Sequence, residues 1–391
     1  MCVQMYVKYV QIQIGDNINM KKIKILSCAG ILASLLLAGC GDKENTNTPV
    51  VTPPEVEEKS DVPLVFVFSG QSNMEGQTNF GINGDTSYLT KAFQDLGITD
   101  GDSCITGINS VMTSYYGNGY GELSRDNYNT GGQSNASQQP HASNTEDKIK
   151  GKFLPTKVGM GHSDSQMGPE LGCAYALKDV GDADKPIYFV KMASSGSGFA
   201  QSGSSAEGKN WEVKTADGTP VEHNLYVDFL KPFLQNNLDW IEETTGKKPV
   251  IKAWCWHQGE SDGGEEAKRN AYARRLADLI DAFRTDFASY ADDENGKNIA
   301  FVDGMPYEGG TMLVSNPADA KALNDIKKAA ADPNDKRYIV DTYANVEEKT
   351  DANLLKVSGD GSTQGVHYNT KDSFRLGMAY GKVILDNILK D

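Results

Sequence analysis

Short apolar runs alternate with longer segments of helical spacing along most of this 391-residue chain. The first run, Leu64 to Phe68, lies between Pro63 and Gly70 and is almost entirely β-branched or aromatic, which is typical of a strand buried on both faces. Four similar runs follow, at 187–190, 250–256, 299–302 and 337–341. Helical segments are expected between these runs at 87–96, 168–180, 224–244, 264–290 and 318–330, and a last one is expected after them at 371–389. This alternation predicts a parallel sheet that is covered by helices on both faces.

Residues 62–391 are therefore expected to form one three-layer α/β/α domain with a five-stranded parallel sheet. The connection after the first strand, 78–167, is unusually long and, beyond one short helix, is rich in Gly, Asn, Ser, Gln and Tyr. Loops of this length are usually functional or disordered. Because Tyr, Asn and Gln can stack on sugars and hydrogen-bond to them, a sugar-binding insertion and a flexible insertion both remain open.

The first sixty residues predict a leader and a tether. Residues 20–40 combine a basic start with an apolar stretch too short for a typical membrane span, and they end in Leu-Ala-Gly-Cys. This ending resembles a bacterial lipobox, which implies that Cys40 is lipidated and that the protein is anchored in the cell envelope, at the outer membrane, facing the periplasm or the surface. A plain secretory signal is the alternative. Residues 1–19 precede a better start at Met20 and suggest a misassigned start codon, and 41–61 has the polar composition of a flexible tether.

Charge and motifs exclude several classes of function. A net charge of −15 argues against an electrostatic nucleic-acid binder, which needs basic patches. The chain contains no P-loop and no G-x-G-x-x-G motif, so nucleotide binding is not expected. No metal-ligand spacing is present either, and we expect neither a metal nor another cofactor.

One serine, Ser72, follows the first strand at the edge where open α/β sheets bind ligands. It could be a nucleophile or could only cap a turn. The segment Gly132–Asn135 repeats the letters Gly-Gln-Ser-Asn around Ser72, but no buried strand precedes it, so its serine is not expected to react. A serine nucleophile needs a base, usually histidine. Two histidines are candidates for this base, because His257 ends a predicted strand and His367 directly precedes the last predicted helix. The other three are expected at the surface: His141, His162 and His223.

Five segments occur in the order that is typical of a known family: 68–76 (FSGQSNMEG), 168–172 (GPELG), 193–196 (ASSG), 257–262 (HQGESD) and 365–369 (GVHYN). Together they resemble the sialate O-acetylesterase group of SGNH hydrolases, which includes the acetylxylan esterases of carbohydrate esterase family 6. The resemblance spans about 63–391 and leaves the insertion unmatched. It implies an SGNH-hydrolase, flavodoxin-like fold. The serine motif differs from the G-x-S-x-G elbow of α/β-hydrolases.

The resemblance also implies the chemistry. Ser72 would be the nucleophile and His367 the general base, and the oxyanion would be bound by the backbone N–H of Ser72, the backbone N–H of Gly196 and the side chain of Gln258. A glycine at 196 lets the backbone approach the substrate closely. The expected reaction is a two-step acyl transfer that removes O-acetyl groups from a carbohydrate, either acetylated xylan, a related polysaccharide or sialate.

The third member of the triad is the open question. Family members commonly carry Asp three residues before the histidine, where this chain has Gln364, which has no negative charge. Glu260 could orient His367, Asp360 could reach it, or the enzyme could use a Ser–His dyad with Gln364 or a backbone carbonyl as the orienting group. We favour Glu260. A general carboxylesterase, and a non-catalytic glycan-binding lipoprotein on a degenerate esterase fold, are the alternative functions.

Overall fold

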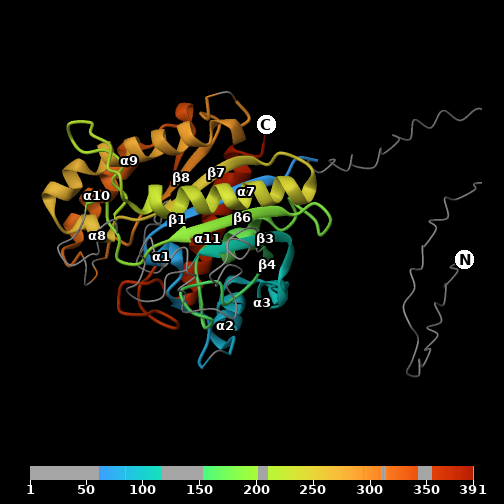
Figure 1. Ribbon diagram of the computed structural model, residues 1–391. Coiled ribbons are helices and arrows are strands. Elements are labelled where there is room, and N and C mark those ends of the chain that lie inside the picture. Colours follow the sequence, from blue (N-terminus) through green and yellow to red (C-terminus); the bar gives the residue numbers. More distant parts are fainter. Residues whose placement is uncertain are drawn as a thin grey trace, which may run out of the picture. The chain divides into compact units, whose positions relative to one another are not determined.

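The central sheet has seven strands in the order β4-β3-β6-β1-β7-β8-β9 (Figure 1). The computed structural model describes residues 61–390 except 84, 117–152, 201–209, 294, 310, 312–313 and 342–354. The strands are β1 Leu64–Gly70, β3 Ile108–Tyr116, β4 Leu154–Thr156, β6 Ile187–Ala193, β7 Val250–His257, β8 Ala300–Gly304 and β9 Arg337–Val340. All neighbours are parallel except β3 and β4, which are antiparallel. A separate antiparallel pair joins β2 Thr78–Asn79 to β5 Gln166–Met167.

The middle strand, β1, is buried on both faces. Val65 and Val67 belong to one apolar core, and Phe66 and Phe68 belong to the other, because successive side chains of a strand point to opposite faces. All four side chains are fully buried. The apolar run therefore joins the two halves of the domain and fixes the register of the sheet.

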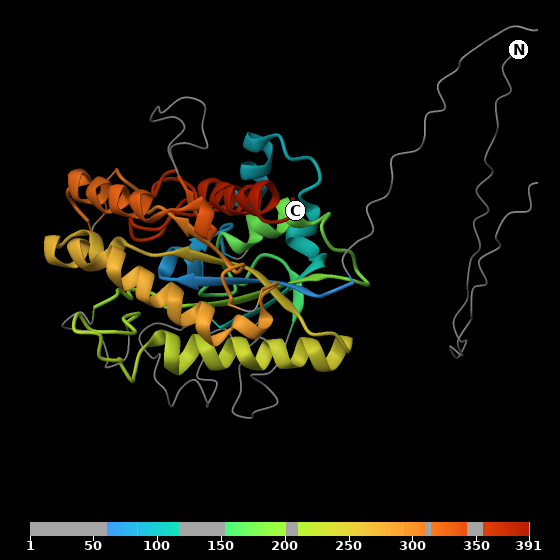
Figure 2. The same ribbon diagram turned by 90° about the horizontal axis from the view of Figure 1, so that it is seen from above.

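Helices cover both faces of the sheet. The core on one side is completed by α7 Lys231–Thr245 and α9 Glu266–Asp286, and the core on the other by α2 Ser87–Leu96, α3 Asp102–Thr106, α6 Glu170–Leu177 and α11 Thr370–Asn387. Figure 2 shows α7 and α11 on opposite sides of the strands. α10 Pro317–Ala330 packs against α9. The remaining helical segments are α1 Ser72–Glu75, α8 Glu260–Gly263, a π-helical turn at Tyr226–Leu230 and two 3₁₀ turns at Ala288–Tyr290 and Pro333–Asp335.

The helices α6 and α11 are in close contact through glycines. A Cβ on Gly172 would lie 2.0 Å from the carbonyl oxygen of Phe374, and a Cβ on Gly377 would lie 2.0 Å from that of Pro169. Only glycine permits this approach. Because α11 directly follows the segment that carries His367, the contact also sets where that segment enters the domain.

The structure confirms the three-layer α/β/α fold and the five predicted strands, but the strand count was wrong. Two further strands of the central sheet, β3 and β4, come from the segment 78–167 that was expected to be a loop with one helix, and the separate pair β2 and β5 comes from it as well. They were missed because β3 contains Asn, Ser and Thr among its apolar residues and β4 has only three residues. The predicted leader with Cys40, and the predicted tether except its last residue, Asp61, lie outside the described residues. No helix in the described part of the chain is long and apolar enough to span a bilayer.

Candidate active site

The carboxyl ends of β6, β1 and β7 meet at one edge of the sheet, with β1 between the other two. Gly70, the last residue of β1, pairs with Ala193 on one side and with His257 on the other. A Cβ on Gly70 would lie 2.0 Å from the carbonyl oxygen of His257, so glycine is required for the strands to stay paired to their ends. The chain order reverses around β1, and ligands of open α/β sheets bind at such a point.

Ser72 is the first residue of the one-turn helix α1 and is 4% exposed. The helix ends at Gly76, whose N–H donates to the Ser72 carbonyl over 2.9 Å from a left-handed conformation (φ +96°). Gly196, exposed and also left-handed (φ +68°), lies in the loop after β6. Among the described residues, the backbone N–H groups of Ser72 and Gly196 donate no hydrogen bond. An oxyanion hole is formed by N–H groups of this kind when they point at the same oxygen.

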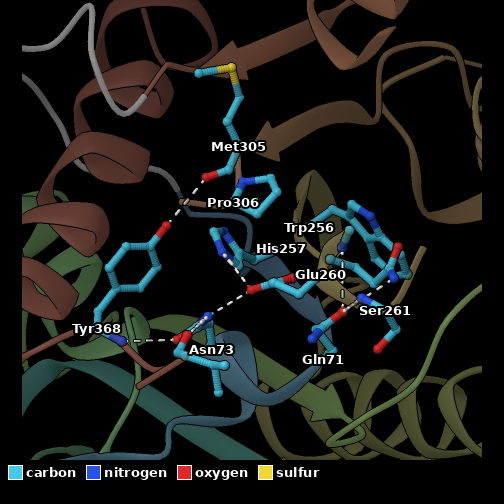
Figure 3. A network of polar contacts seen from close by, with 12 residues as sticks. Gln71, Asn73, Trp256, His257, Glu260, Ser261, Met305, Pro306 and Tyr368 are labelled. Carbon is cyan, nitrogen blue, oxygen red and sulfur yellow. Dashed lines mark hydrogen bonds and ion pairs between the residues drawn. The ribbon is translucent and has the colours of Figure 1, made fainter. Parts of the chain in front are cut away.

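Asn73 connects the turn of Ser72 to the segment of His367, and Figure 3 shows its contact with Tyr368 in that segment. Its Oδ1 accepts a hydrogen bond from the Tyr368 N–H over 3.2 Å, and its Nδ2 donates to the Val366 carbonyl over 3.2 Å. The residue after Ser72 thus binds both neighbours of His367. The sequence alone assigns Asn73 no role, because an asparagine after a strand is common in any turn.

Glu260 lies between Asn73 and His257 (Figure 3). Its Oε1 accepts from Asn73 Nδ2 over 2.6 Å and is 3.7 Å from His257 Nε2. Burial alone would raise the pKa of this carboxyl, but the neighbouring His257 ring and the hydrogen bond from Asn73 outweigh it and lower the pKa to about 2. No hydrogen bond joins Glu260 to His367 in the described part of the chain. The predicted role of Glu260 as the partner of His367 stays a prediction without a direct contact.

Gln258 is fully buried and contacts the segments that follow β1, β6 and β7. Its Nε2 is within 3.2 Å of Gln71 Oε1, 3.3 Å of the Ser197 carbonyl and 2.7 Å of Asp262 Oδ2. The two N–H groups of this amide therefore already face three acceptors. To donate to an oxyanion, Gln258 would have to break one of these hydrogen bonds. Its predicted role in the oxyanion hole therefore also stays a prediction.

His367 is held by a threonine. Its Nδ1 is 2.7 Å from Thr363 Oγ1, and the same hydroxyl donates to the Gln77 carbonyl over 2.7 Å. Burial lowers the pKa of His367, while the negative charges of Glu260 and Glu75 partly oppose this effect. Thr363 was not singled out from the sequence. A hydroxyl four residues before a histidine is a weak signal, because its use depends on the turn between them.

The two other residues considered as partners of His367 point elsewhere. The carboxylate of Asp360 is 4.0 Å from Lys91 Nζ and its side chain is 55% exposed. Gln364 is exposed and has a left-handed backbone (φ +56°). Neither side chain is hydrogen-bonded to His367 among the described residues. The suggested role of Asp360 therefore remains a prediction that no contact supports.

The prediction that His162 lies at the surface was wrong. Its Nδ1 is 3.0 Å from Oε1 of the buried Glu75, in the helix of Ser72, because the loop of His162 folds back over α1. Gln77 donates from Nε2 to Glu75 over 3.4 Å and also to the Ser195 hydroxyl. His223 is exposed, as predicted, and His141 lies outside the described residues.

The site's donors are hydroxyls, amides and single ionisable groups. No group of three or more His, Cys, Asp or Glu side chains that could hold a metal ion occurs in the described part of the chain. The chemistry that these residues can perform themselves is nucleophilic attack by Ser72, proton transfer by His367 and stabilisation of an oxyanion by backbone N–H groups.

Comparisons with known proteins give one family. Residues 118–291 match the profile of the family described as "Carbohydrate esterase, sialic acid-specific acetylesterase". This range contains Gly196, Gln258 and Glu260 but neither Ser72 nor His367. A comparison with curated proteins gives no match.

Several solved structures are similar to this one, and three of them are compared with it next. The chain shares 16% identity with a protein from Arabidopsis thaliana (TM-score 0.48, covering 84% of this chain and 99% of that one) and 14% with NanS (0.45, 84% and 98%). It shares 12% identity with Est24, a carbohydrate acetylesterase from Sinorhizobium meliloti (0.34, 56% and 84%). Over residues 118–291, this chain is therefore similar to the family of sialic acid-specific acetylesterases among the carbohydrate esterases.

Proposed function

We propose that this protein is a serine esterase that removes O-acetyl groups from a carbohydrate. One observation supports this most strongly: Asn73, next to Ser72 in the chain, is hydrogen-bonded to both neighbours of His367. Two direct hydrogen bonds thereby link the turn of the proposed nucleophile to the segment of the proposed base, which lies nearly three hundred positions away in the chain. The family match adds the class of substrate.

The reaction proceeds by two acyl transfers. The Ser72 hydroxyl attacks the carbonyl carbon of the acetyl ester while His367 takes its proton. The negative charge that develops on the carbonyl oxygen is bound by the N–H groups of Ser72 and Gly196. His367 then protonates the departing sugar hydroxyl, and an acetyl group remains on Ser72. Water, deprotonated by His367, attacks this ester; acetate is released, and His367 returns the proton to the Ser72 oxygen.

The substrate is an acetylated sugar, from xylan or a related polysaccharide or from sialate. The mature protein acts in the cell envelope, where lipid on Cys40 anchors it. The two steps above use only Ser72, His367, backbone N–H groups and water.

Acetate release from acetylated xylan, an O-acetylated sialic acid and a chromogenic acetate ester tests the proposal. The full-length protein should release acetate, and Ser72→Ala should abolish the release. Ser134→Ala is the matched control, because Ser134 lies in the same tetrapeptide, Gly-Gln-Ser-Asn, and should leave the rate unchanged. If the folded wild-type protein releases no acetate from any of the three and instead binds the glycans, the proposal is wrong and the glycan-binding alternative holds.

A further inference from the structure

The base of a serine hydrolase needs a group on its second ring nitrogen. That group fixes the ring and decides which nitrogen carries the proton, because a neutral imidazole has one N–H and one basic nitrogen. In this chain no carboxylate within the described residues is hydrogen-bonded to His367. The atom that contacts Nδ1 is Thr363 Oγ1, at 2.7 Å.

The hydrogen bonds of Thr363 determine the direction of this contact. A threonine hydroxyl has a single proton, and it is 2.7 Å from the Gln77 carbonyl, which can only accept. Both short contacts are satisfied only if Thr363 donates to Gln77 and accepts from His367. Nδ1 of His367 must then carry the proton, and Nε2 is left as the basic nitrogen.

We propose that Thr363 is a positioning residue that stands in for the carboxylate of the triad. It accepts the Nδ1–H of His367 and so holds the ring in the tautomer that can take the proton of Ser72 at Nε2. This inference rests on the proposed esterase function for its catalytic consequence, but the tautomer itself does not depend on that function.

The local fold explains why residue 363 has this position. The N–H of His367 donates to the Thr363 carbonyl over 3.3 Å, which closes a turn. Within the turn, Gln364 and Gly365 are both left-handed (φ +56° and +63°). The turn brings the hydroxyl four residues before the histidine to the ring, while the side chain three residues before it, where the family commonly has Asp, is exposed.

The hydroxyl also links the ring to the nucleophile's segment. Gln77 follows Gly76, the residue that ends the helix of Ser72, and its side chain is buried. The chain of contacts therefore runs from the ring of His367 through Thr363 to the backbone just after α1. A neutral hydroxyl cannot stabilise an imidazolium by charge, and the lowered pKa of His367 agrees with a partner of this kind.

In the proton transfer, the Ser72 hydroxyl proton goes to Nε2 and the Nδ1 proton stays on the ring, bonded to Thr363. The ring becomes an imidazolium, and Thr363 neither gains nor loses a proton. Removing the hydroxyl leaves the ring free to rotate or to take the other tautomer. Because correct general-base catalysis contributes 10² to 10⁴ in rate, we expect a loss of kcat on the order of 100-fold in Thr363→Val with little change in KM.

The test is ¹⁵N NMR of the histidine rings in the full-length protein labelled with ¹⁵N-histidine, recorded at a pH where the rings are neutral. The signals of His367 are identified by their absence in His367→Gln. The expected result is a protonated Nδ1 and an unprotonated Nε2. In Thr363→Val, which has the same shape without the hydroxyl, this single tautomer should be lost, and Thr363→Ser should restore both the tautomer and most of kcat.

Ser362→Ala is the matched control. The Ser362 hydroxyl is bonded to the backbone carbonyls of Val357 and His367 but not to the ring, so its loss should leave the tautomer unchanged. A wild-type ring protonated at Nε2 overturns the inference, and so does a Thr363→Val ring with unchanged tautomer and kcat. If the tautomer is as expected but no acetate is released from any ester, the proposed function fails and the placement of the proton stands.

Discussion

Replacing Glu260 by Gln separates a structural role of this carboxylate, beside Asn73 and His257, from a catalytic role as the partner of His367. Gln retains a side-chain oxygen that can accept from Asn73 Nδ2, so the contacts of Asn73 with the segment of His367 should survive. What is lost is the negative charge beside His257. We therefore expect Glu260→Gln to reduce stability much more than activity.

The magnitude follows from the pKa of Glu260. The difference between the ordinary value of 4.5 and about 2 in the folded protein corresponds to about 3 kcal/mol of stability at neutral pH. Because the pKa is lowered by folding, this contribution is complete above pH 4.5 and is lost as the pH falls towards 2. The free-energy difference between wild type and Glu260→Gln should thus shrink steadily below pH 4.5.

Urea unfolding at pH 7, 5, 4 and 3 measures the stability, and acetate release measures kcat/KM. We expect kcat/KM to fall by less than about tenfold, against the about 10⁴-fold loss that is typical when the acid of a triad is replaced by its amide. Glu260→Ala, which also removes the acceptor for Asn73, should lower kcat/KM further than Glu260→Gln. A thousandfold loss in folded Glu260→Gln would refute this reasoning and would show that Glu260 acts on His367 directly.

Three further results are expected. Because burial lowers the pKa of His367 and the base must be neutral, the acidic limb of the kcat/KM profile should have an apparent pKa below 6.5; a limb above 6.5 would contradict this. Lys191, paired over 2.9 Å with Glu170 and fully buried, also donates to the Glu75 carbonyl in α1. Lys191→Met should lower the free energy of unfolding, measured in urea, by about 3–5 kcal/mol. The double variant Lys191→Met with Glu170→Leu should regain part of this stability, and additive losses in the two single variants would count against the pairing. Cys40→Ser should move the protein from the membrane fraction to the soluble fraction, with loss of radiolabelled fatty acid, and unchanged fractionation would disprove lipid anchoring.

The fold could be predicted from the sequence where burial determines it. The run Leu64–Phe68 is apolar at every position because both of its faces are in a core, and such a run is readable without a structure. The strand β3 is at the opposite extreme. It pairs with only one long strand, β6, and a strand near the edge of a sheet tolerates Asn, Ser and Thr, so its sequence resembles the loop that was expected.

The candidate site was predictable only in part. The proposed nucleophile, Ser72, and the proposed base, His367, stand in short motifs with their own composition, so the sequence alone singles them out. Their partners depend on contacts between distant segments. Thr363 reaches the ring only because Gln364 and Gly365 are left-handed, and a left-handed Gln is not expected from sequence. Glu260 has a conspicuous place after β7, but its contacts are with Asn73 and His257.

Several groups of the candidate site come from one short segment of the chain. Residues 72–77 supply the proposed nucleophile, the amide of Asn73 that holds both neighbours of His367, and the Gln77 carbonyl that accepts from Thr363. The segment follows β1, the strand that is buried in the centre of the sheet and needs Gly70 to keep its register with β7. A displacement of this strand end would move the nucleophile and the base together, so their relative geometry would be preserved. A site built in this way can keep its base oriented by neutral hydrogen bonds, because the orientation is set by the nucleophile's own turn and does not require a separate charged residue.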